Sequence, residues 1–484
     1  MDRKSITKNY IYNLMYQILV ILVPLITTPY LSRVLGAEKI GIYSYTISVA
    51  TYFILFGSLG VAMYGQREIA YVQNDKYLRS KNFYEILIMR SITLGISLVV
   101  FYFTFALNGE YSVYYKILML EILANGIDIS WFFQGLEEFK KTVIRNAIVK
   151  IASAILIFIL VKSQNDLIKY FFIYVMSNLL GNITLWISLP KFVQKVDIKE
   201  LNCFKHFKPT LSLFIPQIAV QIYTVLDKTM IGAIIEDKSE VGFYEQAQKI
   251  VKILLAIVTA LGTVMVPRMA STFAKGDTNK IIEYMNKSFK FVLFLAIPLM
   301  FGLISISNKF VPIFYGQGYE KVVYLINISS PIIIFIGLSN AIGTQYLLPT
   351  KRQKEFTISV TIGASINFIL NTILIKYYYS VGASIATVFA EMMVTSIQFY
   401  LVRDVFKIKD ILRISRKYFV ASVAMFVVSM GINIAIKSNV LSILIQVCSG
   451  CIIYFVILII LKDELVLEEI KKLKLLMKKD KALD

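Results

Sequence analysis

Long apolar runs, separated by short polar connections, dominate this chain from end to end. The stretch PYLSRVLGAEKIGIYSY shows the pattern, because one apolar run ends at Leu31 and the next begins at Ile40. An unbroken helix of about 20 residues crosses roughly 30 Å of hydrocarbon and satisfies its own backbone hydrogen bonds there. The alternating short strands of an outer-membrane barrel do not occur in the pattern. We therefore predict an all-α polytopic membrane protein.

The apolar runs predict fourteen transmembrane helices. The first seven are Tyr10–Leu31, Ile40–Tyr64, Phe83–Leu107, Val113–Gly135, Val143–Val161, Leu167–Leu189 and Pro209–Ile234. The second seven are Phe243–Val266, Tyr284–Ile306, Val322–Leu348, Phe356–Ile375, Val381–Val402, Tyr418–Ile436 and Val440–Leu461. Between the first two helices, Gly36 and Gly41 are expected to permit a tight reversal of the chain.

Composition and charge also indicate a bilayer. Hydrophobic residues make up 57% of the 484 residues and charged residues 17%, whereas soluble domains contain about 45–50% apolar residues. The net charge of +20 would suit nucleic acid, but the basic residues sort by loop. With the N-terminus inside, the inner segments and their flanks hold 36 of them and the outer connections hold 10. The positive-inside rule therefore predicts a multi-pass membrane protein with both termini cytoplasmic and no nucleic-acid partner.

Two pairs of similar segments indicate an internal repeat. PYLSRVLGAEKIGIYSYTISV resembles LDKTMIGAIIEDKSEVGFYEQAQKI, and Gly41-Ile-Tyr matches Gly242-Phe-Tyr. QGLEEFKKTVIRNAI, from Gln134, likewise resembles QYLLPTKRQKEFTIS, from Gln345. We therefore predict two six-helix bundles in parallel repeat, followed by two further helices. The corresponding parts are an N-lobe at 1–189, a cytoplasmic linker at 190–208, a C-lobe at 209–402, helices 13 and 14 at 403–462, and a basic cytoplasmic tail at 463–484.

These segments resemble a known family. The motifs PYLSRVLGAEKIGIYSY, LDKTMIG and VGFYEQA, together with fourteen spans and both ends inside, look like the Wzx-type oligosaccharide flippases. These belong to the multidrug, oligosaccharidyl-lipid and polysaccharide export superfamily, and the resemblance covers essentially the whole chain. It implies an alternating-access cavity between two MATE-like lobes. It also implies movement of an undecaprenyl-pyrophosphate-linked glycan from the inner to the outer leaflet for capsule or exopolysaccharide synthesis. Membrane lipid and a polysaccharide polymerase are the further expected partners.

Polar side chains at membrane depth are costly, so we expect them to face a cavity or a partner. In the eighth helix, Glu245, Lys249 and Lys252 share one face at positions i, i+4 and i+7. The repeat-equivalent positions of the second helix carry only neutral groups: Ser44, Ser48 and Thr51. Further polar stripes are Asn9, Asn13 and Gln17; Glu121, Asn125 and Asp128; Gln217, Gln221, Thr224 and Lys228 beside Asp227; and Ser384, Thr387, Glu391, Thr395 and Gln398. Together the stripes predict a wet interior among the first twelve helices.

The embedded cations indicate how such a cavity would hold a diphosphate. Under the predicted topology, two of them lie in the inner half of the membrane and three in the outer half, which suits an anion held first facing in and then facing out. Arginine can grip phosphate oxygens through two N–H groups, and lysine supplies a point charge. The candidate substrate-binding cations are Arg90, Lys150, Lys228, Lys249 and Lys252. The candidate cavity or coupling residues are Glu121, Asn125, Asp128, Gln217, Gln221, Asp227, Glu245 and Glu391, and the candidate mouth residues are Arg33 and Arg67.

Each of these assignments has a structural alternative. The two outer lysines of the eighth helix lie near the surface, where a lysine can extend to the interface. Asp227 with Lys228 would also serve as a pair that closes the outer gate, and Arg90 as a headgroup anchor. For Glu391, near the midplane, a structural hydrogen bond competes with a role in proton or cation coupling. Interface anchoring is the default for the two mouth arginines.

A catalytic function fits the sequence poorly. It contains no P-loop, metal-ligand spacing or nucleophile constellation, so we predict a transporter without cofactor or metal. The CSGC motif at Cys448 lies within the last predicted helix, where thiols act as small apolar groups, and the lone His206 suggests no site. Two alternatives stay open: a drug or cation antiporter of the same superfamily, because five embedded bases balance five embedded acids, and a flippase for teichoic-acid precursors.

Overall fold

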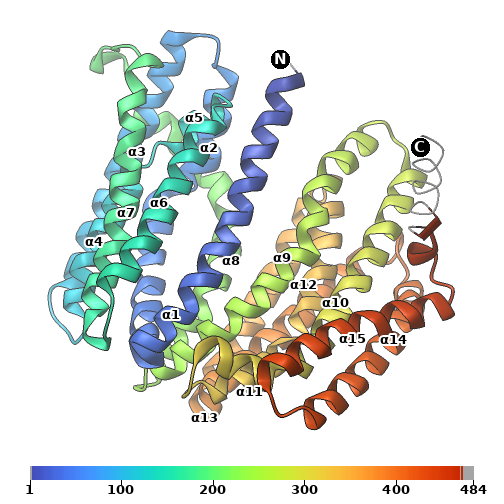
Figure 1. Cartoon of the computed structure of the whole chain (residues 1–484). Helices are drawn as coiled ribbons and strands as arrows, with labels where there is room; N and C mark the ends of the chain where they lie inside the picture. The colour runs from blue at the N-terminus through green and yellow to red at the C-terminus, as the bar shows by residue number, and fades with distance from the viewer. Residues whose placement is uncertain (1–2, 469, 472–484) are drawn as a thin grey trace, which may run out of the picture. The chain divides into compact units, whose positions relative to one another are not determined.

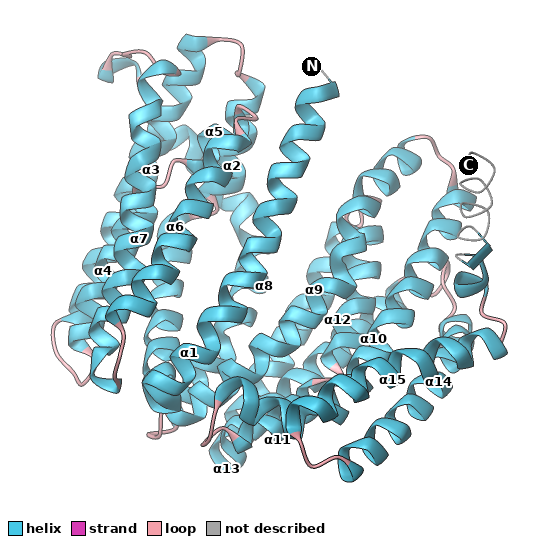
Figure 2. Ribbon diagram, viewed as in Figure 1, coloured by secondary structure: helices cyan, strands magenta, loops and turns pink. Residues whose placement is uncertain are grey.

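The computed structural model describes residues 3–471 except residue 469, with side chains described from residue 18 onward except at 215–217, 219–223 and 263. Within this part of the chain, every regular element is a helix and there is no strand (Figures 1 and 2). Eleven helical segments of the described residues are long and apolar enough to cross a membrane. The predicted class of an all-α polytopic membrane protein is therefore confirmed.

The chain divides into two compact units, residues 1–242 and residues 243–484. The first unit contains helices α1 (Arg3–Ser58), α2 (Val61–Tyr71), α3 (Lys76–Phe101), α4 (Ser112–Gly126), α5 (Ser130–Gly135), α6 (Phe139–Leu160), α7 (Leu167–Ser188) and α8 (Phe207–Ile234). Short turns join them: the π-helical η1 (Tyr102–Ala106) and the 3-10 turns η2 (Gln164–Asp166), η3 (Leu189–Lys191), η4 (Ile198–Glu200) and η5 (Cys203–His206). Thus α8 clusters with the helices that precede it, and the predicted lobe boundary at 190–208 stays a prediction.

The second unit begins at Phe243, within α9 (Ser239–Ala274). It contains α10 (Thr278–Tyr315), α11 (Glu320–Ser329), α12 (Ile332–Ser339), the π-helical η6 (Asn340–Leu347), α13 (Gln353–Leu401), α14 (Ile408–Ala435) and α15 (Asn439–Ile460). The helices α10, α14 and α15 pack on one another within this unit, and α10 also packs on α11 and α12.

Two long elements each contain a break where the apolar pattern predicts the end of one helix and the start of the next. In α1 the break lies at Gly36, with φ 77° and ψ 169°, a backbone conformation that glycine adopts without steric cost. In α13 it lies at Tyr379, with φ 57° and ψ −133°. The predicted turns after Leu31 and Ile375 are therefore present as sharp kinks in otherwise continuous helices.

Other boundaries differ from the prediction. The predicted helix Val113–Gly135 is interrupted, because α4 ends at Gly126 and α5 begins at Ser130. The predicted helix Val322–Leu348 is divided among α11, α12 and η6. Polar residues or proline stand at both interruptions: Asn125, Asp128 and Ser130 at the first, and Ser329, Ser330 and Pro331 at the second. Each stretch as a whole is still apolar enough to predict a single membrane helix, so average hydropathy did not reveal the interruptions. The interruptions matter for function, since backbone groups freed in a membrane must find partners.

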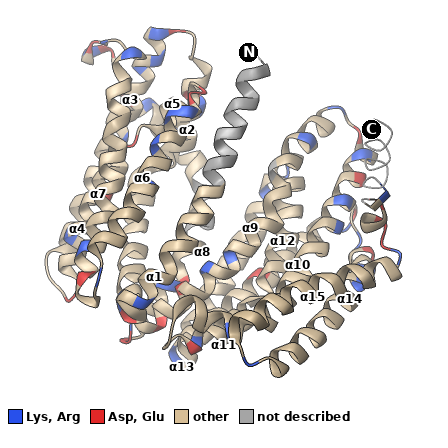
Figure 3. Ribbon diagram, viewed as in Figure 1, with Lys and Arg blue, Asp and Glu red and all other residues tan. Residues whose placement is uncertain are grey.

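Within the first unit, connections predicted to lie on the same side of the membrane lie together. The guanidinium of Arg79, after the α2–α3 connection, donates to the carbonyl oxygen of Phe192 through Nε (3.1 Å) and Nη2 (2.6 Å). At the opposite helix ends, Lys238 Nζ lies 5.9 Å from the ring centre of Tyr111. Lys and Arg residues gather at helix ends, notably around α2, α3 and α5 (Figure 3). These contacts each join connections that were predicted to share a side, while the full alternation of connections and their inside or outside location stay predictions.

Two apolar clusters hold the first unit together. One includes Leu35, Leu118 and Phe171, and the other includes Phe83 and Trp131, whose rings stack with centroids 5.7 Å apart. The residues of α4 belong to the first cluster and those of α5 to the second. The interruption between α4 and α5 therefore lies where the chain passes from one cluster to the other.

Candidate functional site

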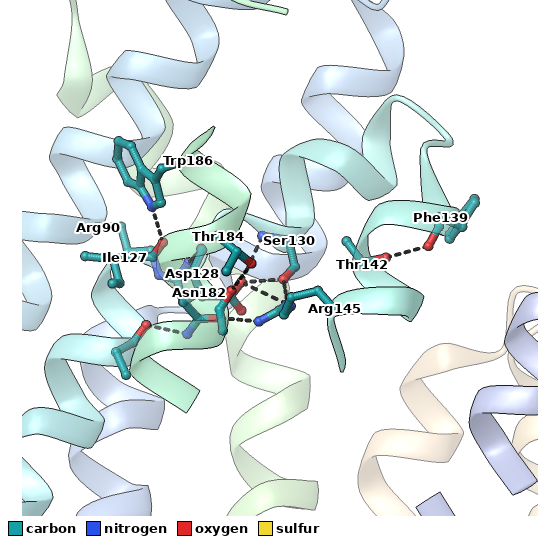
Figure 4. A network of polar contacts seen from close by, with 12 residues as sticks. Arg90, Ile127, Asp128, Ser130, Phe139, Thr142, Arg145, Asn182, Thr184 and Trp186 are labelled. Atoms are coloured by element: carbon teal, nitrogen blue, oxygen red, sulfur yellow. Dashed lines mark hydrogen bonds and ion pairs between the residues drawn. The ribbon is translucent and has the colours of Figure 1, made fainter. Parts of the chain in front are cut away.

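The break between α4 and α5 is the centre of a polar network in the first unit (Figure 4). A helix end leaves carbonyl groups without intrahelical partners. Here Trp186 Nε1 donates to the carbonyl oxygen of Ile127 (2.7 Å), and Arg90 Nη1 donates to that of Asp128 (2.6 Å). The Asp128 carboxylate accepts a hydrogen bond from the backbone N–H of Ser130 (2.9 Å). Side chains from α3 and α7 therefore satisfy the backbone of the break.

A second arginine ties α6 and α7 to the same break. Arg145 Nη2 donates to Ser130 Oγ (2.6 Å), its Nη1 donates to Asn182 Oδ1, and the guanidinium lies 3.8 Å from Asp128 Oδ1. Asn182 in turn donates from Nδ2 to the carbonyl oxygen of Ala124 (2.7 Å). Figure 4 shows these side chains pointing toward one another from separate helices. The arrangement fixes the position of the kink relative to three neighbouring helices.

Arg90, a candidate substrate-binding cation, lies within this network. Its side chain is 4% exposed, and its Nε has no hydrogen-bond partner among the described residues. The buried guanidinium of Arg90 donates to a backbone carbonyl oxygen that the helix break leaves without an intrahelical partner. This geometry favours a structural role for Arg90. Lys150 lies five residues after Arg145 on α6 and is half-buried. Among the described residues, its ammonium group has no polar partner.

Glu121 is the centre of a second polar group, and it lies on α4 five residues before the last residue of that helix, Gly126. It is 8% exposed, and Asn178 Nδ2 lies 3.1 Å and 3.2 Å from its two carboxylate oxygens. Asn125 Nδ2 donates to the Glu121 carbonyl oxygen (3.0 Å) and lies 3.5 Å from Oε1. The rings of Tyr43 and Tyr174 meet edge to face with centroids 5.8 Å apart, one turn of α7 from Asn178. A buried carboxylate with amide partners is suited to bind a proton or a small cation.

A hydrogen bond joins the seventh predicted helix to the polar stripe of the second, through Thr229, which was not among the predicted polar residues. Thr229 Oγ1 donates to Ser48 Oγ (2.8 Å), and Ser48 is buried at 1% exposure. Asp227 is buried and Lys228 half-buried, and both contact other groups. Of the other predicted members of these stripes, Ser44 is buried, Thr51 is half-buried and Thr224 is exposed. The rest, and the first stripe, lie outside the residues whose side chains the structure describes: Gln217, Gln221, Asn9, Asn13 and Gln17.

The two predicted mouth arginines are both exposed. Arg67 forms an ion pair with the adjacent Glu68 at 3.2 Å, and its guanidinium lies 5.5 Å from the ring centre of Tyr64. Such contacts are typical of an arginine at a helix end near the surface. They are compatible with anchoring at the membrane interface and with a position at the mouth of a cavity.

In the second unit, the predicted charged stripe forms along α9. Lys249 Nζ lies 3.7 Å from Glu245 Oε1, with the side chains 37% and 17% exposed. Glutamate four residues before lysine is the favourable order on a helix. Lys252, the third member, is exposed. Because two of the three side chains are accessible, this stripe is open to a charged ligand in a way that the buried Arg90 is not.

Glu391 lies buried in α13 at 7% exposure, with polar groups one turn away on both sides. Thr387 Oγ1 lies 3.2 Å from the hydroxyl of Tyr244, and Thr395 Oγ1 donates to the carbonyl oxygen of Phe335 (2.8 Å). Glu391 itself interacts with a neighbouring group. The stripe predicted in the twelfth helix thus lies against α9 and α12 within the unit, and it carries a buried acid.

Comparison with known families identifies the chain. The family model "Polysaccharide biosynthesis protein" matches residues 6–273, and the model "Lipid II flippase MurJ" matches residues 147–455. Each match covers more than half of the chain. The chain belongs to the polysaccharide biosynthesis family of Wzx-type flippases. The superfamily expected from its motifs is therefore confirmed.

Individual relatives agree with this flippase family. A protein of Escherichia coli (strain K12) named as an O-antigen transporter is 26% identical over 408 residues, which cover 83% of this chain and 98% of that protein. The fold is similar to that of the lipid II flippase MurJ in an inward closed conformation, with TM-score 0.75 and 20% identity over 94% of this chain and 100% of that one. An inward-facing multidrug resistance transporter of the MATE family gives TM-score 0.62 and 12% identity, over 82% and 95% of the two chains.

Several polar residues of this flippase were missed in the sequence. Arg145 falls inside the predicted fifth helix, but it was counted with the flank of an inner loop, so its role as an embedded cation was overlooked. Gln345 is fully buried in the π-helical η6, where Ser288 Oγ donates to its Oε1 (2.9 Å) and its Nε2 donates to Asn340 Oδ1 (3.2 Å). The available signal was the cost of an amide at membrane depth.

Proposed function

We propose that this flippase translocates an undecaprenyl-pyrophosphate-linked oligosaccharide repeat unit from the inner to the outer leaflet of the bacterial plasma membrane by alternating access. The observation that carries the proposal is the likeness to a protein named as an O-antigen transporter across 98% of that protein. The buried acids and accessible cations of the membrane helices support it, since a charged headgroup needs a polar path across hydrocarbon. The product would serve capsule or exopolysaccharide synthesis.

The transmembrane topology proposed for this function has fourteen helices. The eleven candidate spans include α1 and α13, each of which contains a break, and α8 is a further helix of 28 residues that is not among the eleven. Counting each broken element twice and adding α8 gives fourteen. An even number keeps both termini on one side, and the distribution of basic residues favours the cytoplasm.

We propose that Lys249 and Lys252 contact the pyrophosphate. Lys252 is exposed and the Lys249 side chain is 37% exposed, whereas Arg90 is 4% exposed and donates to a backbone carbonyl oxygen. A lysine needs little geometric precision to attract a diphosphate, because its charge is compact and its stem flexible. Two of them, less than one turn apart on α9, would give a local excess of positive charge even with Glu245 nearby.

A complementation experiment tests both the function and the lysines. In a strain that lacks its own repeat-unit flippase, the wild-type chain should restore surface polysaccharide, and the double variant Lys249→Ala/Lys252→Ala should not, although it inserts normally. Lys287→Ala is the matched control, because Lys287 lies at a surface helix end and pairs with Glu283 at 2.6 Å. Wild-type polymer from the double variant would remove these lysines from the mechanism.

A reconstituted assay separates this proposal from an antiporter. Proteoliposomes containing the wild-type chain should move a fluorescent undecaprenyl-pyrophosphate-linked glycan between leaflets and should not accumulate lipophilic cations. Accumulation of such cations without glycan movement would replace the proposal by the antiporter. The same vesicles, with imposed proton, sodium or voltage gradients, test coupling in Glu121→Gln and Glu391→Gln. If either variant keeps the wild-type dependence on the gradient, that acid is structural.

A further inference from the structure

The linker between α7 and α8 is fixed to α3 through its own backbone. Besides the hydrogen bonds from Arg79 to a linker carbonyl oxygen, the backbone N–H of Gln194 donates to Ser80 Oγ (2.9 Å). Further along, the backbone N–H of Asn202 donates to Glu85 Oε1 (2.8 Å). In each of these contacts the linker uses a main-chain group. Its conformation is therefore held without the help of its apolar side chains.

Two large apolar side chains of this fixed segment face solvent. Ile198, the first residue of η4, has 81% of its surface exposed, and Phe204, in η5, has 75%. A single exposed apolar side chain is common on protein surfaces. Two on one short segment, each beside a residue that contacts α3, are a feature that the packing of the first unit does not explain. Removing them from water would be favourable, so they suit a surface that is covered from outside.

The same segment is basic. Its five lysines are all exposed, and only two acids, Asp197 and Glu200, stand among them, which leaves a net charge of +3 over residues 190–208. From α6, Lys141 adds a further cation, because its Nζ lies 3.9 Å from the ring centre of Phe192. Apolar side chains that alternate with lysines are typical of segments that lie on a membrane surface. The five lysines are Lys191, Lys195, Lys199, Lys205 and Lys208.

The linker lies at the level where α3 is predicted to enter the membrane. The helix begins at Lys76, whereas the apolar run that predicts the third span begins at Phe83. The residues of α3 that hold the linker, Arg79, Ser80 and Glu85, are each within about one helical turn of that boundary. At this depth an apolar side chain can reach the acyl region and a lysine can reach the headgroups.

We propose that the linker is a contact surface for anionic phospholipid of the inner leaflet. Ile198 and Phe204 insert at the membrane interface, and the exposed lysines bind lipid phosphate groups. Charge complementarity favours this occupant, because the cytoplasmic leaflet carries anionic lipids and attracts basic segments. Under the predicted topology the linker is cytoplasmic. None of its residues belongs to the proposed substrate contacts, so the proposal does not depend on which substrate the protein moves.

A fluorescent label on the linker tests whether the bilayer covers it. In a full chain whose three cysteines are replaced by alanine, bimane is attached at Ile198→Cys, and the protein is placed in nanodiscs of phosphatidylcholine with or without phosphatidylglycerol. Phosphatidylglycerol should shift the emission to the blue and increase quenching by lipids with brominated acyl chains several-fold. High salt should reduce this difference. Asn279→Cys is the matched control, because Asn279 is exposed and lies at the α9–α10 connection, which is predicted to share the side of the linker.

The outcomes separate the possible occupants. If the label at Ile198→Cys stays as accessible to aqueous iodide as that at Asn279→Cys in both nanodiscs, the bilayer does not cover the linker and the proposal fails, which leaves this surface to a protein partner. Equal quenching with and without phosphatidylglycerol would show an apolar contact that does not recognise anionic headgroups, and would also overturn the proposal.

Removal of charge tests the lysines. Lys195→Gln/Lys199→Gln, combined with the label at Ile198→Cys, should lose most of the response to phosphatidylglycerol while the melting temperature stays unchanged, since both lysines are exposed. Lys275→Gln/Lys280→Gln removes the same charge from exposed positions of the α9–α10 connection and should keep the response. An equal loss of response in the two double variants would mean that total charge, and not the linker, attracts the lipid.

Discussion

Gly41 and Gly242 lie at a close contact between two segments of the chain. Gly41 faces the backbone carbonyl oxygen of Lys238, and Gly242 faces that of Ala37. A Cβ atom on Gly41 would lie 1.7 Å from the carbonyl oxygen of Lys238, and one on Gly242 would lie 2.1 Å from that of Ala37. The contact is reciprocal, because residues 37 and 238, like residues 41 and 242, are 201 positions apart. These are the glycines that the sequence comparison matched. Within the first unit, α1 and the start of α9 therefore pack through equivalent residues, as in a twofold contact.

This contact predicts a strong requirement for glycine at both positions. Gly41→Ala and Gly242→Ala should each lower the melting temperature in detergent and reduce surface polysaccharide, because a methyl group would overlap backbone that cannot rotate away. Overpacking typically costs about 1–3 kcal/mol. Gly95→Ala is the control, since a Cβ there meets nothing within 4 Å. If Gly41→Ala is as stable as Gly95→Ala, the close packing of these helices is wrong.

A second prediction concerns the network at the α4–α5 break. Arg145→Met keeps much of the side-chain volume but removes the donors that contact Ser130, Asn182 and Asp128. Loss of such buried partners should destabilise the protein by about 1–3 kcal/mol. Arg145→Lys should be intermediate, because an ammonium cannot present donors in the planar arrangement of a guanidinium. Thermal unfolding in detergent measures both.

Lys150→Met provides the matched control for this comparison. Lys150 lies on the same helix, but its ammonium group contacts no described polar group, so its removal should change the melting temperature much less. A loss of stability in Lys150→Met equal to that in Arg145→Met would show that charge on α6, and not the network, is what matters.

A third prediction concerns the Glu121–Asn178 pair. Glu121→Gln replaces one acceptor oxygen by an amide nitrogen, which then faces the donor group of Asn178, so stability should fall by about 1 kcal/mol. The double variant Glu121→Gln/Asn178→Asp restores a donor opposite a carboxylate and should recover much of that stability. A double-mutant cycle measures the coupling. Strictly additive losses would mean that the two side chains do not interact in the membrane.

The sequence predicted regular features well where local pattern determines them. The apolar runs located the turns at Gly36 and near Tyr379, and helical spacing predicted the contact between Glu245 and Lys249, found at 3.7 Å. The spacing of Glu121 and Asn125 likewise predicted neighbours, and their side chains are in contact.

Features that depend on tertiary contacts were less predictable. Ile127–Ile129 reads as continuous helix, so Asp128 was expected on the face of Glu121, whereas the break directs it to Arg145 and Ser130. A hydropathy pattern shows that a charged residue lies in an apolar segment, where burying it is costly. It does not show which group that residue contacts. The partner of Arg90 is a backbone carbonyl oxygen, which has no signature in the sequence because every residue has one. The candidate substrate and coupling roles therefore stay predictions.

The lone histidine supplies a last prediction, although the sequence suggested no site for it. His206 is 2% exposed; its Nδ1 lies 2.7 Å from the hydroxyl of Tyr64 and its Nε2 lies 2.9 Å from Glu85 Oε2. The same carboxylate accepts the backbone N–H of Asn202 (2.8 Å) and pairs with Lys205 Nζ at 2.6 Å. These contacts dock the end of the linker, at η5, onto α3.

Burial lowers the pKa of His206 below its ordinary value, with Lys205 adding to the shift and the carboxylates of Glu85 and Glu68 opposing it. The lowered pKa favours a neutral imidazole in the docked linker, and in that form Nδ1 can accept from Tyr64 while Nε2 donates to Glu85. An undocked linker, with a pKa of roughly 6.5, binds a proton more readily. Docking is therefore most stable when the pH is above the pKa of the undocked histidine. It weakens as the pH falls from that pKa toward the lower pKa of His206 in the docked linker.

Limited proteolysis of the linker in detergent should reveal this dependence. Cleavage within 195–205 should increase as the pH is lowered from about 7.5 to about 5.5, across the range in which histidine titrates, after correction for the protease's own pH profile. His206→Gln cannot take up the proton, so its cleavage should change little over the same range. Tyr64→Phe keeps the imidazole and should retain the pH dependence with a higher baseline. A slope in His206→Gln equal to that of the wild type would assign the effect to another group.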